Sequence, residues 1–105
     1  MQIHDITNIL TKNFNVNTQT QNTWSLFVNH IYQYKNEYYK IKCYNNKSLL
    51  LDFHKRSMNI LRTTNDIINN IDLDDKKIEY ELKYYVNSLI ESFLKFNIEE
   101  LKSNR

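Results

Sequence analysis

The sequence predicts a mostly α-helical protein, a small helical bundle in which a short N-terminal helix precedes three longer helices. Apolar residues recur every three or four positions through most of the chain, which is the spacing of one helix face. Pairs of Asn residues interrupt this pattern at 45–46 and 69–70, where short turns would connect neighbouring helices. The 105 residues suffice for a single domain, 1–105, that buries a core without metals or disulfides.

The first predicted element is a short helix at 5–14, with the sequence DITNILTKNF. Asp5 is placed to cap it, because an Asp side chain accepts hydrogen bonds from the open N–H groups of a first turn. The apolar face of this helix would comprise Ile6, Ile9, Leu10 and Phe14. The polar run at 15–22 has the composition of a loop.

Residues 10–17 resemble the turn region of repressor-type helix-turn-helix motifs. Leu10 would end the positioning helix, and Asn15 would occupy the place usually taken by the turn Gly. The resemblance implies a recognition helix, beginning with 18–24, that lays polar side chains on base edges in the major groove. Those side chains are Thr18, Gln19, Gln21 and Asn22. The resemblance therefore supports DNA binding as an alternative function.

Residues 23–44 have two interpretations. As a helix capped by Thr23, the segment places aromatic and aliphatic residues every three or four positions. As strands, 38–44 alternates apolar with polar residues, the Asn pair forms a hairpin turn, and 48–53 returns. The length of the segment favours the helix, and a β-hairpin around 38–53, with an α+β fold, is the alternative.

Two further helices are predicted at 48–70 and 72–103. In the second, Asp72 is a suitable N-cap, and the apolar face spans about half of the cylinder. A helix that lies on one surface needs an apolar stripe only about 100° wide, so this face exceeds what one neighbour requires. The residues expected to bind another protein are Tyr80, Tyr84, Glu91, Leu94 and Ile98. Interfaces are enriched in aromatic residues with apolar neighbours, which this set provides.

The net charge of +2 is unevenly distributed along the chain. Residues 30–62 carry seven Lys or Arg against two acids, whereas 63–105 carries six against nine. The seven cations are Lys35, Lys40, Lys42, Lys47, Lys55, Arg56 and Arg62. The tyrosines interleaved with them are Tyr32, Tyr34, Tyr38, Tyr39 and Tyr44. Cations meet phosphates and Tyr rings stack on bases, so this segment is the candidate nucleic-acid-binding region.

The sequence contains no constellation typical of catalysis or of a cofactor site. His4, His30 and His54 lack metal-ligand spacing, and Cys43 is the single cysteine. The His-Lys-Arg segment that begins at His54 is expected to be a solvated basic turn. Without Gly, the chain cannot form a Gly-rich phosphate loop. The sequence therefore predicts a non-enzymatic protein with no catalytic residues, no metal and no cofactor.

Three features favour an intracellular, cytoplasmic protein without a membrane partner. A lone cysteine fits a reducing compartment, no signal sequence opens the chain, and no apolar run is long enough to span a membrane. The lack of Gly, Pro and Ala, together with sixteen Asn, indicates an AT-rich genome. Such genomes are found among viruses, phages and other mobile elements, and also in some cells.

The sequence thus favours a protein-binding module. Its expected role is that of an inhibitor or adaptor, directed by a virus, phage or mobile element at a nucleic-acid-handling host assembly. Direct binding to DNA or RNA, through the basic middle segment or the helix-turn-helix, is the alternative. The wide apolar face of the last helix also fits a homodimer seam.

Overall fold

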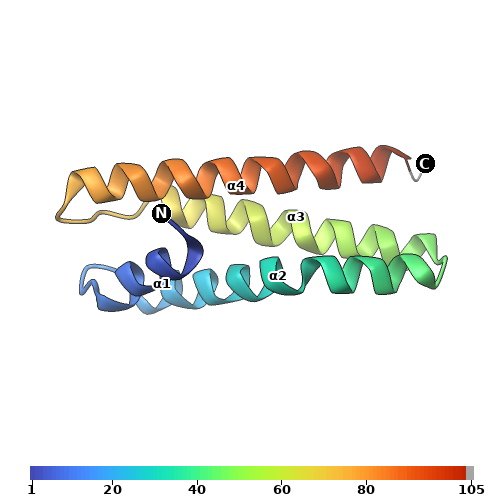
Figure 1. The fold of residues 1–105 in the computed structure, drawn as a ribbon, viewed down its shortest axis with the longest axis horizontal. Coiled ribbons are helices and arrows are strands. Elements are labelled where there is room, and N and C mark those ends of the chain that lie inside the picture. The colour runs from blue at the N-terminus through green and yellow to red at the C-terminus, as the bar shows by residue number, and fades with distance from the viewer. Residues whose placement is uncertain (104–105) are drawn as a thin grey trace.

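The computed structural model describes residues 1–103 and consists of four α-helices. The helices are α1 (Ile3–Lys12), α2 (Thr18–Cys43), α3 (Lys47–Asn69) and α4 (Lys76–Ser103). Figure 1 shows α2, α3 and α4 running the length of the molecule, with α1 beside α2 at the end where the α3–α4 connection lies. The molecule is elongated, with extents of 48 × 21 × 19 Å. It is the small helical bundle that the sequence predicts.

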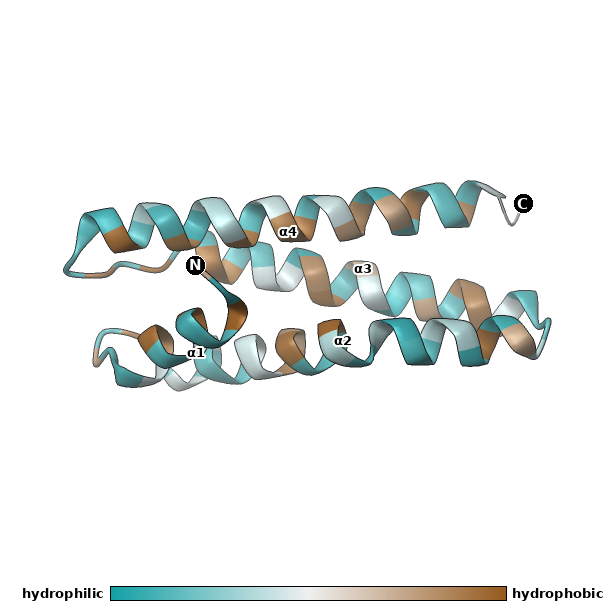
Figure 2. Cartoon of the chain, viewed as in Figure 1, coloured by the Kyte–Doolittle hydropathy of each residue, from teal (hydrophilic) through white to brown (hydrophobic). Residues whose placement is uncertain are grey.

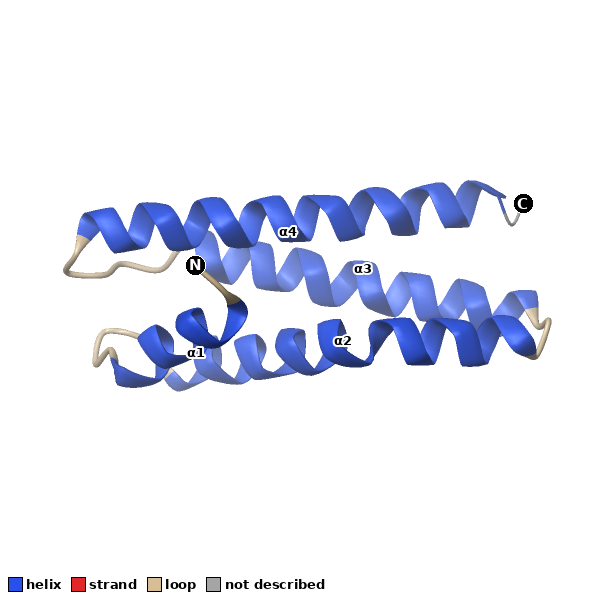
Figure 3. Ribbon diagram, in the orientation of Figure 1, coloured by secondary structure: helices blue, strands red, loops and turns tan. Residues whose placement is uncertain are grey.

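The β-hairpin alternative at 38–53 is wrong, because the described part of the chain contains helices and loops but no strand (Figure 3). Tyr38, for example, is buried on the core side of α2. The Asn pair does form a turn, but one between helices. Asn45 has a φ of 51°, and the Asn46 side chain accepts from the Leu49 N–H at 3.2 Å. In a chain without Gly, Asn supplies the left-handed residue that ends a helix.

The first helix begins and ends two residues earlier than predicted. Asp5 lies inside its first turn rather than before it, and the Asp5 carboxylate accepts from the Gln2 N–H at 2.9 Å. Phe14 therefore falls beyond the helix, where it is fully exposed. The expectation that Phe14 joins the apolar face is wrong, because the spacing of three and four residues continues past the last residue of α1.

The start of the second helix also differs from the prediction. Most of the polar run at 15–22 is helical, so its interpretation as a loop is wrong. Asn17 caps α2, since its side chain accepts from the Thr20 N–H at 2.8 Å. Thr23, the predicted cap, lies inside the helix instead. Asn and Thr are both suitable caps, so composition alone does not separate the two starting points.

The last helix begins at Lys76 rather than next to Asp72. Asp75 caps it, because the Asp75 Oδ1 accepts from the N–H groups of Lys77 and Ile78 at 3.0 and 3.2 Å. The Asp72 carboxylate pairs instead with the Lys76 ammonium. The acidic run before α4 therefore contains the cap, as predicted, but at its last member rather than its first.

Two apolar clusters lie along the bundle. The larger cluster, at the α1 end, has fully buried members that include Ile6, Leu10, Phe27, Leu61, Leu82 and Val86. The smaller cluster, nearer the α2–α3 turn, consists of Tyr34, Tyr38, Leu50 and Phe53. Figure 2 shows hydrophobic positions recurring along each helix among hydrophilic ones, which is the amphipathic pattern of a bundle helix.

Candidate functional site

The five residues predicted to bind protein share one side of α4, which we call the α4 outer stripe. It comprises Tyr80, Tyr84, Glu91, Leu94 and Ile98. At about 100° per residue, their spacing confines them to an arc of about 80°. Tyr80 and Tyr84 are 71% and 67% exposed, and their rings stack with centroids 6.4 Å apart. Ile98 is 36% exposed, Glu91 is exposed, and Leu94 is half-buried against the larger cluster.

The α4 outer stripe borders α3, and two hydrogen bonds set the register between these helices. The side chains of Asn69 on α3 and Asn87 on α4 donate to each other, at 3.4 and 3.1 Å. Because the helices are antiparallel, a step of seven residues along each places Arg62 at the level of Leu94. A further step brings Lys55 to the C-terminal end of α4. Two cations predicted for nucleic acid therefore lie on α3 at the level of the C-terminal part of α4.

All seven cations of the middle segment are exposed. Arg56 is engaged within the chain, since its guanidinium pairs with Glu37 and lies 5.7 Å from the centroid of the Phe53 ring. The interleaved tyrosines divide into two groups. Tyr32, Tyr39 and Tyr44 are exposed, whereas Tyr34 and Tyr38 are buried. Three of the five predicted rings are therefore open for stacking on bases.

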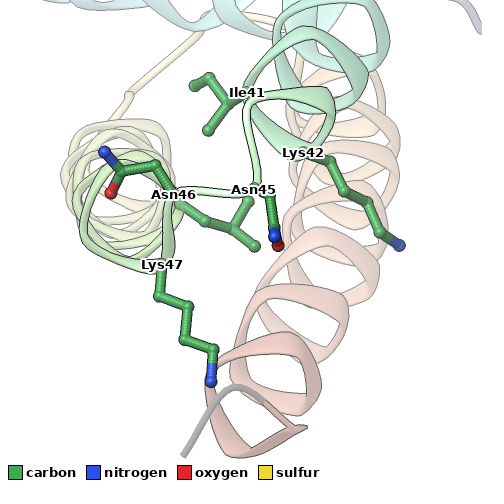
Figure 4. A pocket seen from close by; sticks show the side chains of 6 residues that line it. Ile41, Lys42, Asn45, Asn46 and Lys47 are labelled. Atoms are coloured by element: carbon green, nitrogen blue, oxygen red, sulfur yellow. The ribbon is translucent and has the colours of Figure 1, made fainter.

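The α2–α3 turn carries a hollow of about 120 Å³ (Figure 4). It is lined by Ile41, Lys42, Asn45, Asn46, Lys47 and Leu50. In Figure 4 the Lys42 and Lys47 side chains point in different directions from the turn. The Lys42 ammonium lies 5.5 Å from the centroid of the Tyr38 ring on its own helix. The two cations therefore do not converge on one point at which an anion could sit.

In the segment that resembles a helix-turn-helix, α2 begins at Thr18, as the resemblance implies. The Gln21 side chain is occupied, since it donates to the Leu10 carbonyl at 3.2 Å. Asn15 does not adopt the positive φ of a turn Gly, because Asn45 is the residue within 1–103 that does. The other predicted base-reading side chains, Thr18, Gln19 and Asn22, are exposed.

A group of buried polar side chains, which we call the polar layer, lies where the two apolar clusters meet. It comprises His30 and Tyr34 of α2, His54 and Ser57 of α3, and Asn97 of α4. The Asn97 Nδ2 donates to Ser57 Oγ at 3.1 Å and to the Phe93 carbonyl at 2.8 Å. The Asn97 Oδ1 lies 3.1 Å from the Tyr34 hydroxyl and 2.5 Å from His54 Nδ1. His30 joins through its Nε2, which lies 2.7 Å from Ser57 Oγ.

The acceptor oxygen of Asn97 determines where one proton of the polar layer lies. An amide oxygen only accepts, so His54 donates to Asn97 from Nδ1. Ser57 Oγ accepts from Asn97 and still has a second lone pair and its own proton, so it can bond His30 Nε2 in either tautomer of that ring. His54 Nε2 is the one buried side-chain nitrogen or oxygen of the described chain without a hydrogen-bond partner.

The prediction of a solvated basic turn beginning at His54 is wrong, because His54 is fully buried in the middle of α3. Sequence reasoning misses the polar layer because Ser and Asn are usually surface residues. The signal that could have found it is helical phase. His30 follows Phe27 by three residues, and Asn97 follows Phe93 by four, so both fall on core-facing sides.

The stability of the protein is expected to fall as the pH drops below about 6.5, the ordinary pKa of His. Burial, opposed by Glu37 and assisted by Arg56, lowers the pKa of His30. The unfolded chain therefore binds a proton at a pH where the folded chain does not, and the free energy of unfolding decreases with the pH. Urea denaturation at about pH 7.5 and about pH 5.5 measures this change. An NMR titration that places the His30 pKa at or above its ordinary value would contradict it.

The comparisons with known proteins give no match. None of the protein-family models, curated proteins or solved structures that were compared with the chain matches it. Within residues 1–103, no group of three or more His, Cys, Asp or Glu side chains is placed to hold a metal ion. None of the helices in the same range combines the length and the apolar character needed to cross a lipid bilayer.

Proposed function

We propose that the protein is a protein-binding module that docks on its partner through the α4 outer stripe. The observation that carries this proposal is the exposed, stacked pair of Tyr80 and Tyr84. Neither ring belongs to either apolar cluster, so both are available to another molecule. A Tyr side chain offers a large contact area with few rotatable bonds and a polar hydroxyl, and Tyr is enriched at interfaces for these reasons.

The rest of the stripe suits a partner surface of mixed character. Leu94 and Ile98 continue the apolar contact area toward the C-terminal end of α4, while Glu91 adds one negative charge. Arg62 and Lys55 of α3 are exposed cations at the level of this part of α4. Aromatic and aliphatic anchors beside a charged rim are the usual anatomy of a specific interface.

We extend the proposal to an inhibitor or adaptor that acts on a nucleic-acid-handling host assembly. The support for this extension is compositional, because a chain without Gly, Pro or Ala and with sixteen Asn is typical of AT-rich viruses, phages and mobile elements. Affinity purification of the full chain from its native host, followed by mass spectrometry, identifies the partner. A partner unrelated to nucleic acid would overturn the extension and leave the docking surface to be tested by itself.

The double variant Tyr84→Ala with Ile98→Asp tests the docking surface. We expect it to weaken binding to the identified partner by about 30-fold or more, which corresponds to the loss of one interface hot spot of about 2 kcal/mol. Isothermal titration calorimetry with the purified proteins measures the change.

The matched control is Tyr32→Ala with Leu26→Asp, which truncates one Tyr and charges one aliphatic residue at exposed positions of α2. The control should bind as the wild type does, and circular dichroism should show that both double variants are folded. If the α4 variant is folded and its affinity for the partner is unchanged, the α4 outer stripe is not the docking surface.

A second candidate function is direct binding to DNA or RNA through the basic middle segment. It is favoured by the exposure of all seven cations and of Tyr32, Tyr39 and Tyr44. Binding through phosphates would weaken steeply between about 50 and 200 mM salt, because each contact releases counterions. A gel shift at the lower salt concentration distinguishes the two functions, since no complex with any DNA or RNA there would exclude the second.

A further inference from the structure

The short α1 helix occupies the position of a fourth bundle helix at only one end of the molecule. Its Ile6 and Leu10 belong to the larger apolar cluster together with Val86 of α4. On the α2 side, the Trp24 indole N–H donates to the Thr7 hydroxyl at 2.8 Å. Figure 1 shows that α1 stops far from the α2–α3 turn, so it joins α2 and α4 at one end and leaves the other end uncovered.

At the uncovered end, aromatic side chains of α2 and α4 form the floor of an open depression, which we call the α2–α4 groove. It contains a hollow of about 270 Å³ lined by Tyr34, Ser92, Phe93 and Phe96. The Phe96 ring centroid lies 6.0 Å from that of Tyr34 and 5.6 Å from that of Tyr38. Phe96 is nevertheless 37% exposed, so this aromatic floor is incompletely covered.

The groove lies on the same face of α2 that α1 covers at the other end of the molecule. Trp24, which contacts α1, and Tyr38, which lies in the floor of the groove, are two seven-residue steps apart and therefore on one helix face. The α2 helix has 26 residues and α1 has ten, so about 16 residues of α2, or roughly 24 Å, extend past α1. A helix of about three to four turns fits this length.

The two walls of the groove differ in charge. On the α2 wall, the Lys42 ammonium lies 5.5 Å from the Tyr38 ring centroid, and Lys35 is one seven-residue step away on the same face. On the α4 wall, Ser92 is exposed at the margin of the hollow, and Glu99 follows it by seven residues. A helix in the groove is therefore matched best when its acidic residues face α2 and its neutral or basic residues face α4.

We propose that the α2–α4 groove binds an amphipathic helix of a second protein, with Ile or Leu residues toward the aromatic floor and acidic residues along the edge that faces α2. The neighbouring seat is filled in this way by α1, whose Ile6 and Leu10 are buried. This is helix-in-groove recognition, in which apolar side chains at i, i+3, i+4 and i+7 are the anchors. The groove is distinct from the α4 outer stripe, so failure of one proposed site in its test does not affect the other.

Fluorescence anisotropy with labelled synthetic peptides tests the groove on the full chain. The probe is a helical peptide of about 16 residues with a stripe of Leu and with two Glu residues one seven-residue step apart on one edge. The comparison peptide has Lys in place of both Glu. We expect the Glu peptide to bind saturably, and at least about tenfold more tightly than the Lys peptide at low salt.

Three variants locate the binding. Ser92→Trp fills the hollow from its exposed margin, so it should weaken binding of the Glu peptide by at least about tenfold. Lys35→Glu with Lys42→Glu should reverse the preference in favour of the Lys peptide. The control, Asn8→Ala with Thr11→Ala, lies on the exposed side of α1, outside the groove, and should bind the Glu peptide as the wild type does. Circular dichroism establishes that each variant is folded.

Several results would overturn the proposal. One is the absence of saturable binding of the Glu peptide up to about 1 mM. Another is an affinity for the Glu peptide that is unchanged in folded Ser92→Trp. The third is a peptide preference that is unchanged after the charge reversal at Lys35 and Lys42. Light scattering provides an independent outcome. A concentration-dependent dimer that Ser92→Trp abolishes would assign the groove to a second copy of this chain instead.

Discussion

Replacement of Asn97 by Leu is expected to lower the free energy of unfolding by about 3 kcal/mol or more, because it removes the centre of the polar layer. The Asn97 oxygen accepts from the Tyr34 hydroxyl and from His54 Nδ1, and its nitrogen donates to Ser57. Leaving a buried donor without its partner costs about 1–3 kcal/mol, and two such donors are left in this variant. The loss is a large share of the roughly 5–15 kcal/mol that is typical of a small domain.

Urea denaturation followed by circular dichroism measures the effect. The matched control is Asn87→Leu, which makes the same substitution on the same helix at a position whose hydrogen bonds to Asn69 are open to solvent. The control should cost less than about 1 kcal/mol. Equal losses in the two variants would mean that the polar layer contributes no more to stability than a surface contact does.

The side-chain partners of Asn97 come from two other helices, which gives the polar layer a second consequence. Tyr34 lies on α2, and Ser57 and His54 lie on α3, so all of these bonds form together in only one alignment of α4 against the other helices. A slide of α4 by one helical turn would leave several buried polar groups unpaired. An apolar layer would tolerate such a slide better, because dispersion contacts are less directional than hydrogen bonds.

The fold could be predicted because the apolar spacing that indicates a helix is repeated many times along the chain. α2, α3 and α4 each run for about six to eight turns, so the apolar spacing recurs often enough to outweigh the local alternation that suggested a hairpin. Helix boundaries are less predictable, because each rests on one capping residue. Asn17 and Thr23 are both suitable caps for α2, and the difference between them depends on tertiary packing.

The α4 outer stripe could be predicted in part, and for a related reason. Helical phase alone places Tyr80 and Tyr84 away from the core side of α4, and both are exposed. The same phase cannot indicate which side chains α3 brings next to the stripe. The level of Arg62 along the stripe depends on the register between two helices that are joined by the Asn69–Asn87 contact. Contacts of this kind are properties of the packed bundle, not of either helix.

The α2–α4 groove could be predicted only in part, because it depends on how α1 packs along α2. The sequence predicts a first helix of ten residues, 5–14, and α1 also has ten, so the length of α1 could be predicted although its boundaries could not. The length of α1 decides how much of the space between α2 and α4 it fills. Which side chains lie beyond α1 depends on the packing of the helices, and the structure leaves Phe96 37% exposed there.

The double variant Ile6→Ala with Leu10→Ala is expected to lower the thermal midpoint of unfolding by about 15 °C or more. Both side chains are fully buried in the larger apolar cluster. Truncation of a buried Ile or Leu to Ala costs about 2–5 kcal/mol, and each kcal/mol corresponds to about 4–8 °C in a domain of this size. Differential scanning calorimetry measures the shift. Asn8→Ala with Thr11→Ala, on the exposed side of the same helix, is the control and should change the midpoint by only a few degrees.

The decrease in the thermal midpoint of this variant shows whether α1 is part of the cooperative core or a detachable helix. A loss as large as expected means that Ile6 and Leu10 are integral to one cooperative core, so the groove beyond α1 is a fixed feature of the folded protein. A shift as small as that of the control would contradict this, because the three long helices would then be stable without α1. In that case α1 would be a detachable helix in its own seat, and the seat and the α2–α4 groove would form one continuous surface along α2.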